Sequence, residues 1–229
     1  MHPAHVLDDG EVTLGAGFSG RIPVDPSALV AVEEDEDMRI VEEAAFSPGI
    51  APWIGGRFGM GSNVEAGLTY SGRTIRLDGR YAVDFGDGAR KPMTLSLGIG
   101  ASGLLPKRRE EPDIRVGGFG GDVPLLLGFR SSGDIYALWL GARGGAEIIE
   151  GKHQLPADLI DPTFVIDEDI EGWHTYVGGL LGVRVGFRFI HAVLEVNTAM
   201  HFSEATVGGR DITARLFEVS PSGALVVNF

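Results

Sequence analysis

Residues 74–85 read Thr74-Ile75-Arg76-Leu77-Asp78-Gly79-Arg80-Tyr81-Ala82-Val83-Asp84-Phe85 and alternate between two kinds of side chain. The odd-numbered positions are apolar or glycine, and all the charged residues fall at even-numbered positions. Successive side chains of a β-strand point to opposite faces, so this period of two predicts a strand. The helical spacing i, i+3, i+4 does not fit the stretch.

The same alternation recurs in residues 64–71, 93–101 and 190–201. Clusters of Gly, Asn, Asp, Pro and Ser mark the turns between such stretches. Together these signals predict ten strands, with approximate ranges 11–22, 51–60, 64–72, 74–85, 92–101, 122–130, 134–146, 172–185, 188–202 and 212–229.

The lengths of the predicted strands and of their connections select among all-β folds. Most of the strands have nine or more residues, the length that crosses the hydrocarbon core of a bilayer when tilted. Connections after the even-numbered strands are short, and those after the odd-numbered strands are mostly long: 23–50, 102–121, 147–171 and 203–211, with the tight turn at 71–73 as the exception. We therefore expect residues 1–229 to form a single antiparallel up-and-down transmembrane β-barrel of about ten strands. Long loops would lie at one rim and both termini at the other.

The composition limits the classes of function. The chain has 229 residues, 44% of them hydrophobic, no cysteine and a net charge of -13. This apolar content excludes disorder, the excess of acid argues against nucleic acid as a partner, and the lack of cysteine excludes thiolate chemistry. The acid is concentrated in segments 23–50 and 147–171, each with eight acidic residues and one basic residue. We expect both to be loops. The apolar residues 28–32 and 38–41 in the first are compatible with a short helix on the surface, and also with a segment that caps the mouth of the barrel or enters it.

A soluble β-sandwich or lipocalin-like barrel would turn the apolar face inward instead. Two features favour a membrane barrel. Glycines such as Gly67, Gly98 and Gly100 share the charged face, and small residues beside paired charges suit a narrow interior. Aromatic residues near the predicted strand ends fit interfacial girdles. These are Tyr70, Phe85, Phe129, Tyr136, Trp173 and Phe229.

The last five residues, Leu225-Val226-Val227-Asn228-Phe229, alternate apolar positions and end on an aromatic ring. They resemble the carboxy-terminal signal read by the barrel-assembly machinery, although the glycine of that pattern is displaced by one position, to Gly223. Over nearly its whole length the chain resembles small bacterial outer-membrane β-barrel proteins. The resemblance implies an outer-membrane location, export as a precursor, contact with outer-membrane lipid or lipopolysaccharide, and recognition of Phe229 by the assembly machinery. The opening residues contain no signal peptide in this sequence.

By strand parity, the lumen of such a barrel would hold both arginines and carboxylates. Buried charges must be paired, so cross-strand networks are expected. Either they plug the barrel as a structural envelope component, or they line a narrow passive pore for small polar solutes. The predicted lumen-lining residues are Arg57, Glu65, Arg76, Asp78, Arg80, Arg130, Arg184, Glu195, Arg215 and Glu218.

Two alternative functions follow from other residues. His201-Phe202-Ser203 resembles the His-x-Ser of outer-membrane lipid A deacylases, with Glu218 as the orienting carboxylate, which would make the chain a lipid-modifying hydrolase. An adhesion or binding barrel would act through the acidic loops instead. His174, His191 and Glu195 complete the candidate catalytic groups.

The metal-binding signal is confined to one short run. Asp167, Asp169 and Glu171 resemble the first half of a calcium-binding EF-hand loop, but Gly178 stands where the closing glutamate belongs. The sequence predicts no metal and no cofactor.

Overall fold

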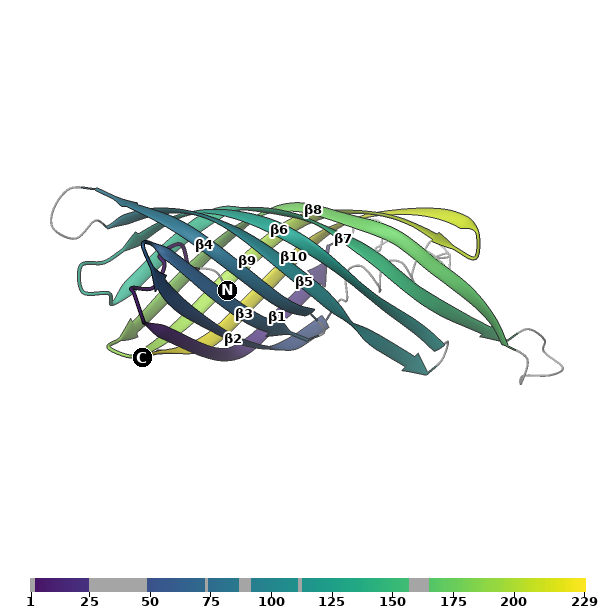
Figure 1. Ribbon diagram of the computed structural model, residues 1–229, viewed down its shortest axis with the longest axis horizontal. Helices are drawn as coiled ribbons and strands as arrows, with labels where there is room; N and C mark the ends of the chain where they lie inside the picture. The colour runs from purple at the N-terminus through teal and green to yellow at the C-terminus, as the bar shows by residue number, and fades with distance from the viewer. Residues whose placement is uncertain (1–2, 25–48, 73, 87–91, 111–112, 157–164) are drawn as a thin grey trace.

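The computed structural model describes the chain except for residues 1–2, 25–48, 73, 87–91, 111–112 and 157–164. Each strand pairs antiparallel with its sequence neighbours, and β1 pairs with β10 to close the barrel (Figure 1). The strands are β1 (Val12–Pro23), β2 (Gly49–Gly61), β3 (Val64–Ser71), β4 (Thr74–Phe85), β5 (Met93–Glu110), β6 (Asp113–Arg130), β7 (Tyr136–Pro156), β8 (Val165–Phe187), β9 (Ile190–Val207) and β10 (Arg210–Asn228). The prediction of a ten-stranded antiparallel barrel is confirmed.

β1 begins and β10 ends at the rim with the short turns, as predicted, and residues 3–11 fold from there into the lumen. The backbone N–H of Val12 donates to the carbonyl of Phe229 at 3.2 Å, and that of Phe229 donates back at 2.8 Å. At the β2–β3 turn of the same rim, Ser62 and Asn63 adopt φ values of 53° and 62°. Tight two-residue hairpins require such left-handed conformations.

The strands differ in length from one side of the barrel to the other. Strands β1–β4 have 8 to 13 residues, whereas β5–β10 have 18 to 23 and extend beyond the others at the rim opposite the termini (Figure 1). The predicted long loops 102–121, 147–171 and 203–211 are wrong in their described parts, because those residues mostly continue strands β5–β10. The predicted loop 23–50, with its apolar runs, lies almost wholly outside the described residues.

The extended strands keep their period of two but exchange the two faces. In the extension the inward side chains are apolar and the outward ones are charged, among them Arg115, Glu150, Lys152 and Asp169. Beyond the bilayer the outside meets water, so the apolar face turns inward. This exchange at the membrane boundary explains why residues that continue a strand look like a loop in sequence. The buried inward cluster contains Val116, Ile149, Ile170, Ala205, Val207, Ile212 and Leu216.

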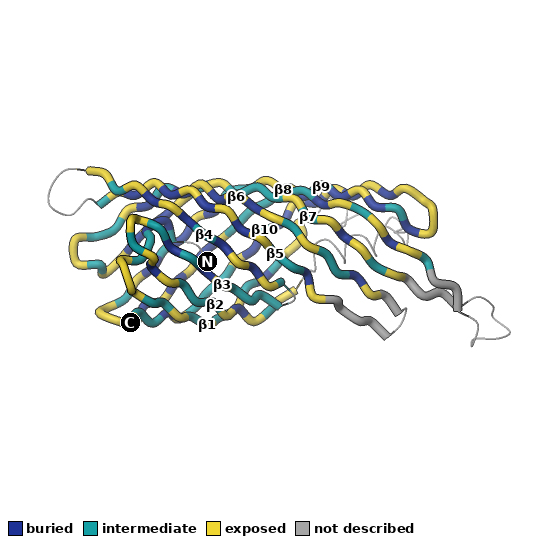
Figure 2. Tube along the Cα trace, viewed as in Figure 1, coloured by how far each residue is buried: buried dark blue, intermediate teal, exposed yellow. Residues whose placement is uncertain are grey.

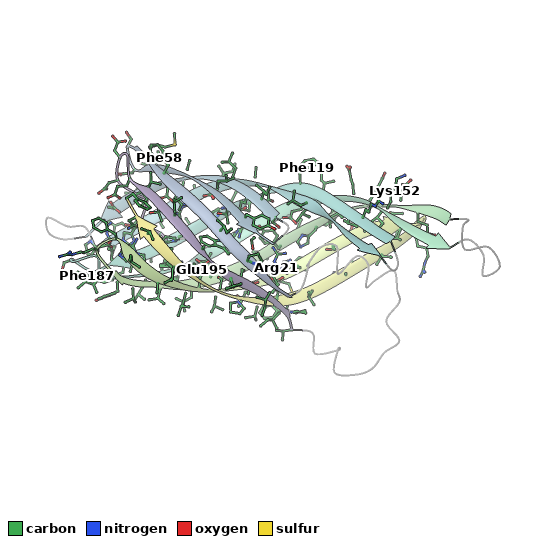
Figure 3. The ribbon with its side chains drawn as sticks, turned by 90° about the horizontal axis from the view of Figure 1, so that it is seen from below. Arg21, Phe58, Phe119, Lys152, Phe187 and Glu195 are labelled. Atoms are coloured by element: carbon green, nitrogen blue, oxygen red, sulfur yellow. The ribbon has the colours of Figure 1, made fainter. Side chains whose placement is uncertain are left out.

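The outer surface between the two rims is apolar. Buried and exposed residues alternate along every strand (Figure 2), and the exposed ones include Leu77, Ile99 and Leu140 at 56–70% exposure. On β6, Phe119 and Phe129 are ten positions apart, which is roughly 25 Å along the normal of a tilted strand and matches the height of a membrane barrel's apolar band. Figure 3 places Phe58 and Phe187 at one end of the barrel and Lys152 at the other, with Phe119 between them. No helix among the described residues has the length and apolarity of a membrane span.

Candidate functional site

A network of alternating charges crosses the lumen. Glu65 accepts hydrogen bonds from Arg57 and Arg80. The Nη2 atom of Arg57 lies 2.5 Å from Oδ2 of Asp78. Asp78 also binds Arg76, with Nη1 to Oδ1 at 2.5 Å. The residues lie on the neighbouring strands β2, β3 and β4, so their side chains, which share the inner face, contact one another directly. The network continues from Arg76 over β5 to β6 and β7.

The next member of the network is Asp122 on β6, two strands from Arg76 around the barrel. Both oxygens of Asp122 accept from Arg76, at 2.7 and 2.8 Å, and both accept from Arg143 on β7, at 3.1 and 2.9 Å. Two bidentate guanidinium pairs on one carboxylate are strong and geometrically restrictive. The side chain of Asp122 is 1% exposed, so the pairing compensates for its loss of hydration.

Glycines provide the space for the guanidinium groups. A Cβ atom at Gly100 would lie 2.6 Å from Arg76 Nη2, and one at Gly67 would lie 2.8 Å from Arg57 Nη1. A side chain at either position would therefore displace the guanidinium group from its place in the network.

The N-terminal segment, residues 3–11, closes the part of the lumen near the short-turn rim, which we call the lower lumen. Its Ala4 is 0% exposed and packs in an apolar cluster with Trp53, Leu126, Trp139, Leu180, Val193 and Val226. The segment is joined to the ion-pair network because the Leu7 N–H donates to Glu65 Oε2 at 3.0 Å and Arg80 donates to the Pro3 carbonyl. Burial, followed by the charge of Arg130, lowers the pKa of His5 in this segment from its ordinary 6.5 to about 4. Sequence reasoning assigned this segment no role.

A polar cavity of about 160 Å³ lies beside the network, lined in part by Arg143, Glu147, His174, His201 and Glu218. A chain of contacts runs along its wall from β7 to β10. Glu147 Oε2 is 3.2 Å from His174 Nδ1, His174 Nε2 is 2.8 Å from His201 Nδ1, and His201 Nε2 is 3.7 Å from Glu218 Oε2.

The structure brings five of the predicted lumen residues together in the network: Arg57, Glu65, Arg76, Asp78 and Arg80. Glu195 also faces inward, but its Oε2 accepts from the indole N–H of Trp139 at 3.0 Å. Glu218 faces the cavity, as the parity of its strand predicts.

Three predicted lumen residues lie elsewhere. Arg184 pairs with Asp134 near the short-turn rim, and Arg130 is at that rim. Arg215 is a correction, because it faces outward and stands 5.8 Å from the ring of Phe202. Its predicted parity is wrong because the inward positions of β10 are the even ones, where Ala214, Leu216 and Glu218 are buried.

Sequence reasoning missed Asp122, Arg143 and Glu147 as members of the site. The alternation of side chains along β6 and β7 could have identified Asp122 and Arg143. Val123, Leu125, Leu138 and Leu140 are apolar and exposed outside, so even positions of β6 and odd positions of β7 face the lumen. Glu147 was assigned to a loop, although it continues β7 directly opposite His174.

The candidate catalytic residues His201 and Ser203 share the inner face of β9, as predicted, and Glu218 stands beside His201. The Ser203 side chain is buried at 0% exposure, and its hydroxyl has no hydrogen-bond partner among the described residues. It therefore faces the packed interior and not the lipid. His191, another candidate, is 1% exposed and lies on the same strand near the short-turn rim.

The residues of the calcium-loop resemblance do not form a loop. Asp167, Asp169 and Glu171 continue β8 and pair in register with Gln154, Lys152 and Glu150. The backbone of this run is extended, whereas a calcium-binding loop curves around its ion. Within the described part of the chain, no cluster of three or more His, Asp or Glu residues has the geometry to hold a metal.

A closed antiparallel barrel with an apolar outer band and a charged interior defines the class of transmembrane β-barrels of the outer-membrane type. No protein-family model matches the chain, and no curated protein matches its sequence. Among solved structures, Neisserial surface protein A is similar over 96% of this chain and 96% of its own, with 11% identity and a TM-score of 0.33. Ail, the attachment invasion locus protein of Yersinia pestis, covers 96% of this chain and 99% of its own, with 8% identity and a TM-score of 0.28. The CymD monoaromatic hydrocarbon channel covers 97% and 89%, with 9% identity and a TM-score of 0.24. These scores are low, so the class rests on the geometry of the barrel.

Proposed function

We propose that this chain is a bacterial outer-membrane β-barrel whose lumen is closed, and that it serves as a structural component of the envelope instead of a passive pore. The observation that carries the proposal is the double obstruction of the lumen. A chain of ion pairs runs from Arg80 to Arg143, and the apolar cluster around Trp139 and Ala4 fills the lower lumen.

The physical cost of opening supports the closed state. A solute path through the network would separate bidentate arginine and carboxylate pairs whose side chains are almost fully buried. Breaking one such buried pair costs about 3–5 kcal/mol. Thermal fluctuation would therefore open this route only rarely.

The test is conductance in a planar bilayer. Insertion is verified by heat-modifiable gel migration, and the expected result is a silent bilayer. The matched variant replaces Trp139 by alanine, which removes one of the two tryptophan side chains of the cluster while leaving the outer surface unchanged. Frequent discrete channel openings of the unmodified protein would overturn the closed-barrel proposal in favour of the narrow pore.

The hydrolase alternative receives no support from the described geometry, because Ser203 is enclosed and faces the interior. If hydrolysis of a lipid A substrate were detected and then abolished by Ser203→Ala, that alternative would replace the structural role.

Adhesion through the acidic segments stays a prediction. Deleting 147–171 would remove parts of β7 and β8, so charge substitutions at the exposed Glu150, Asp169 and Glu171 are the better test. Contact with outer-membrane lipid and recognition of Phe229 by the assembly machinery also remain predictions. Phe229 is 70% exposed, which leaves its ring accessible.

A further inference from the structure

Four side chains from four consecutive strands form a continuous chain in the upper lumen, the part farther from the short-turn rim than the Trp139 cluster. Glu147 on β7 lies opposite His174 on β8, and His174 is followed by His201 on β9 and Glu218 on β10. The side chains are 13%, 3%, 9% and 9% exposed in that order. The two imidazole planes differ by only 10° and their ring centroids are 5.0 Å apart, so the 2.8 Å contact between their nitrogens lies close to the line that joins the two rings.

Counting hydrogens shows what the chain requires. It has three contacts: Glu147 with His174, His174 with His201, and His201 with Glu218. The first two contacts, at 3.2 and 2.8 Å, are hydrogen bonds and need one hydrogen each. The third, at 3.7 Å, is at the distance of an ion pair, which forms when His201 carries a proton on Nε2. Two neutral imidazoles bring one ring N–H each, which is two hydrogens for three contacts. A third hydrogen completes the chain and leaves one positive charge on the histidine pair between two carboxylates.

Without that hydrogen, one contact consists of two facing lone pairs. The contact between His201 Nε2 and Glu218 Oε2 is the longest, at 3.7 Å, and is the one expected to separate. Other polar groups hold the carboxylates in place, since Ser102 donates to Glu147 at 3.4 Å and Ser220 donates to Glu218. The two carboxylates are therefore fixed, and the proton is the variable component.

The groups around the chain carry both signs of charge. Arg21 of β1, Arg76 of β4 and Arg143 of β7 line the same cavity, as do Glu195 of β9 and Tyr176 of β8. Arg76 pairs with Asp78 and Asp122, and Arg143 pairs with Asp122 and stands 5.7 Å from the centre of the Tyr176 ring. The tyrosine ring lies 5.7 Å from each of the two imidazoles, which shields them from bulk water.

We propose that Glu147, His174, His201 and Glu218 form a binding site for one proton, shared by the two imidazoles, which links the inner faces of β7–β10. The bound proton completes three side-chain contacts across the four strands β7–β10. Without these contacts, only backbone hydrogen bonds join each strand to the next. Release of the proton leaves the wall of the cavity one unit more negative and breaks one of the three links. The site goes beyond a structural role and would make the cavity wall respond to the pH outside the cell.

The test is nuclear magnetic resonance of the full chain refolded in detergent micelles, with the histidine ring nitrogens labelled with ¹⁵N. His174→Gln and His201→Gln variants assign the two signals. The expected result is that both imidazoles respond to pH at one shared midpoint and together release a single proton. Two independent midpoints would overturn the proposal.

A variant at the end of the chain tests the hydrogen count. In Glu218→Gln the amide can donate the missing hydrogen to His201, so the chain is complete without the extra proton. The loss of a charge at this distance then moves the shared midpoint down by at least about one pH unit. The matched control is Glu204→Gln, an outward-facing glutamate on β9 that should leave the midpoint unchanged. Equal midpoints in the two variants would refute the site, and Glu147→Gln applies the same test at the other end if Glu218→Gln does not refold.

Discussion

Replacement of Glu65 by glutamine is the most direct test of the ion-pair network. The Glu65 side chain is 1% exposed and accepts from Arg57, from Arg80 and from the Leu7 N–H. Glutamine keeps the volume but removes the charge, so Arg80 loses its carboxylate partner inside the barrel and Arg57 retains only Asp78. Removing one member of a buried pair costs about 3–5 kcal/mol, which lowers the folding equilibrium constant by roughly two to four powers of ten.

The assay is equilibrium unfolding by guanidinium in detergent micelles, followed by tryptophan fluorescence in both directions to verify reversibility. Asp169→Asn is the matched control. It neutralises a carboxylate of the same chain whose partner Lys152 is 3.8 Å away, with both side chains more than half exposed. Exposed pairs contribute less than about 1 kcal/mol, so this variant should unfold nearly as the parent does. Equal losses in the two variants would refute the reasoning that burial makes the network strong.

Further predictions concern the lower lumen. Gly128→Val places a side chain where a Cβ would already lie 2.6 Å from a Cβ of the N-terminal segment, so we expect proteases to cut that segment at least about tenfold faster. Gly103→Ala, at a position with open space, should not change the rate. The pKa of His5 is about 4 when the segment is docked and about 6.5 when it is free, so the free form binds more protons between these values. Docking should weaken as pH falls from about 6.5 to about 4, measured by hydrogen exchange in the segment, and His5→Phe should remove this dependence. Gly182→Ala would bring a Cβ to 2.2 Å from the Trp139 ring, and the barrel should lose about 1–3 kcal/mol of stability in the same guanidinium assay. An unchanged unfolding midpoint would show that the ring can move aside.

Much of the barrel could be predicted because strand periodicity is a local property. The membrane part of each strand has lipid on one side and the lumen on the other, so the alternation in residues 74–85 is read directly from neighbouring positions. The extensions of β5–β10 beyond the bilayer were not predicted, and the reason is also local. Beyond the bilayer the preference of each face is reversed, and residues 147–156, where Ile149 turns inward and Glu150 turns outward, resemble an acidic loop in sequence.

The site was predicted in part. Arg76, Asp78 and Arg80 follow from one strand, and the parity of that strand puts them inside. Their partners do not follow from it, because the pairing of Arg76 with Asp122 joins residues 46 positions apart, on β4 and β6, over the intervening β5. The contact between His174 and His201 likewise depends on the register of β8 against β9, which no local pattern specifies.

By itself, the sequence of this protein determined the number of strands, their direction, the rim that holds the termini and the identity of the charged face. Each of these depends on the alternation of side chains along a strand and on the chemistry of short turns. Only the tertiary structure decided that the lumen is closed, that residues 3–11 help to close it, and that two histidines share one contact between two carboxylates. Closing the barrel fixes the stagger between strands and the width of the interior, and these two quantities decide which inward side chains are within hydrogen-bond distance of one another.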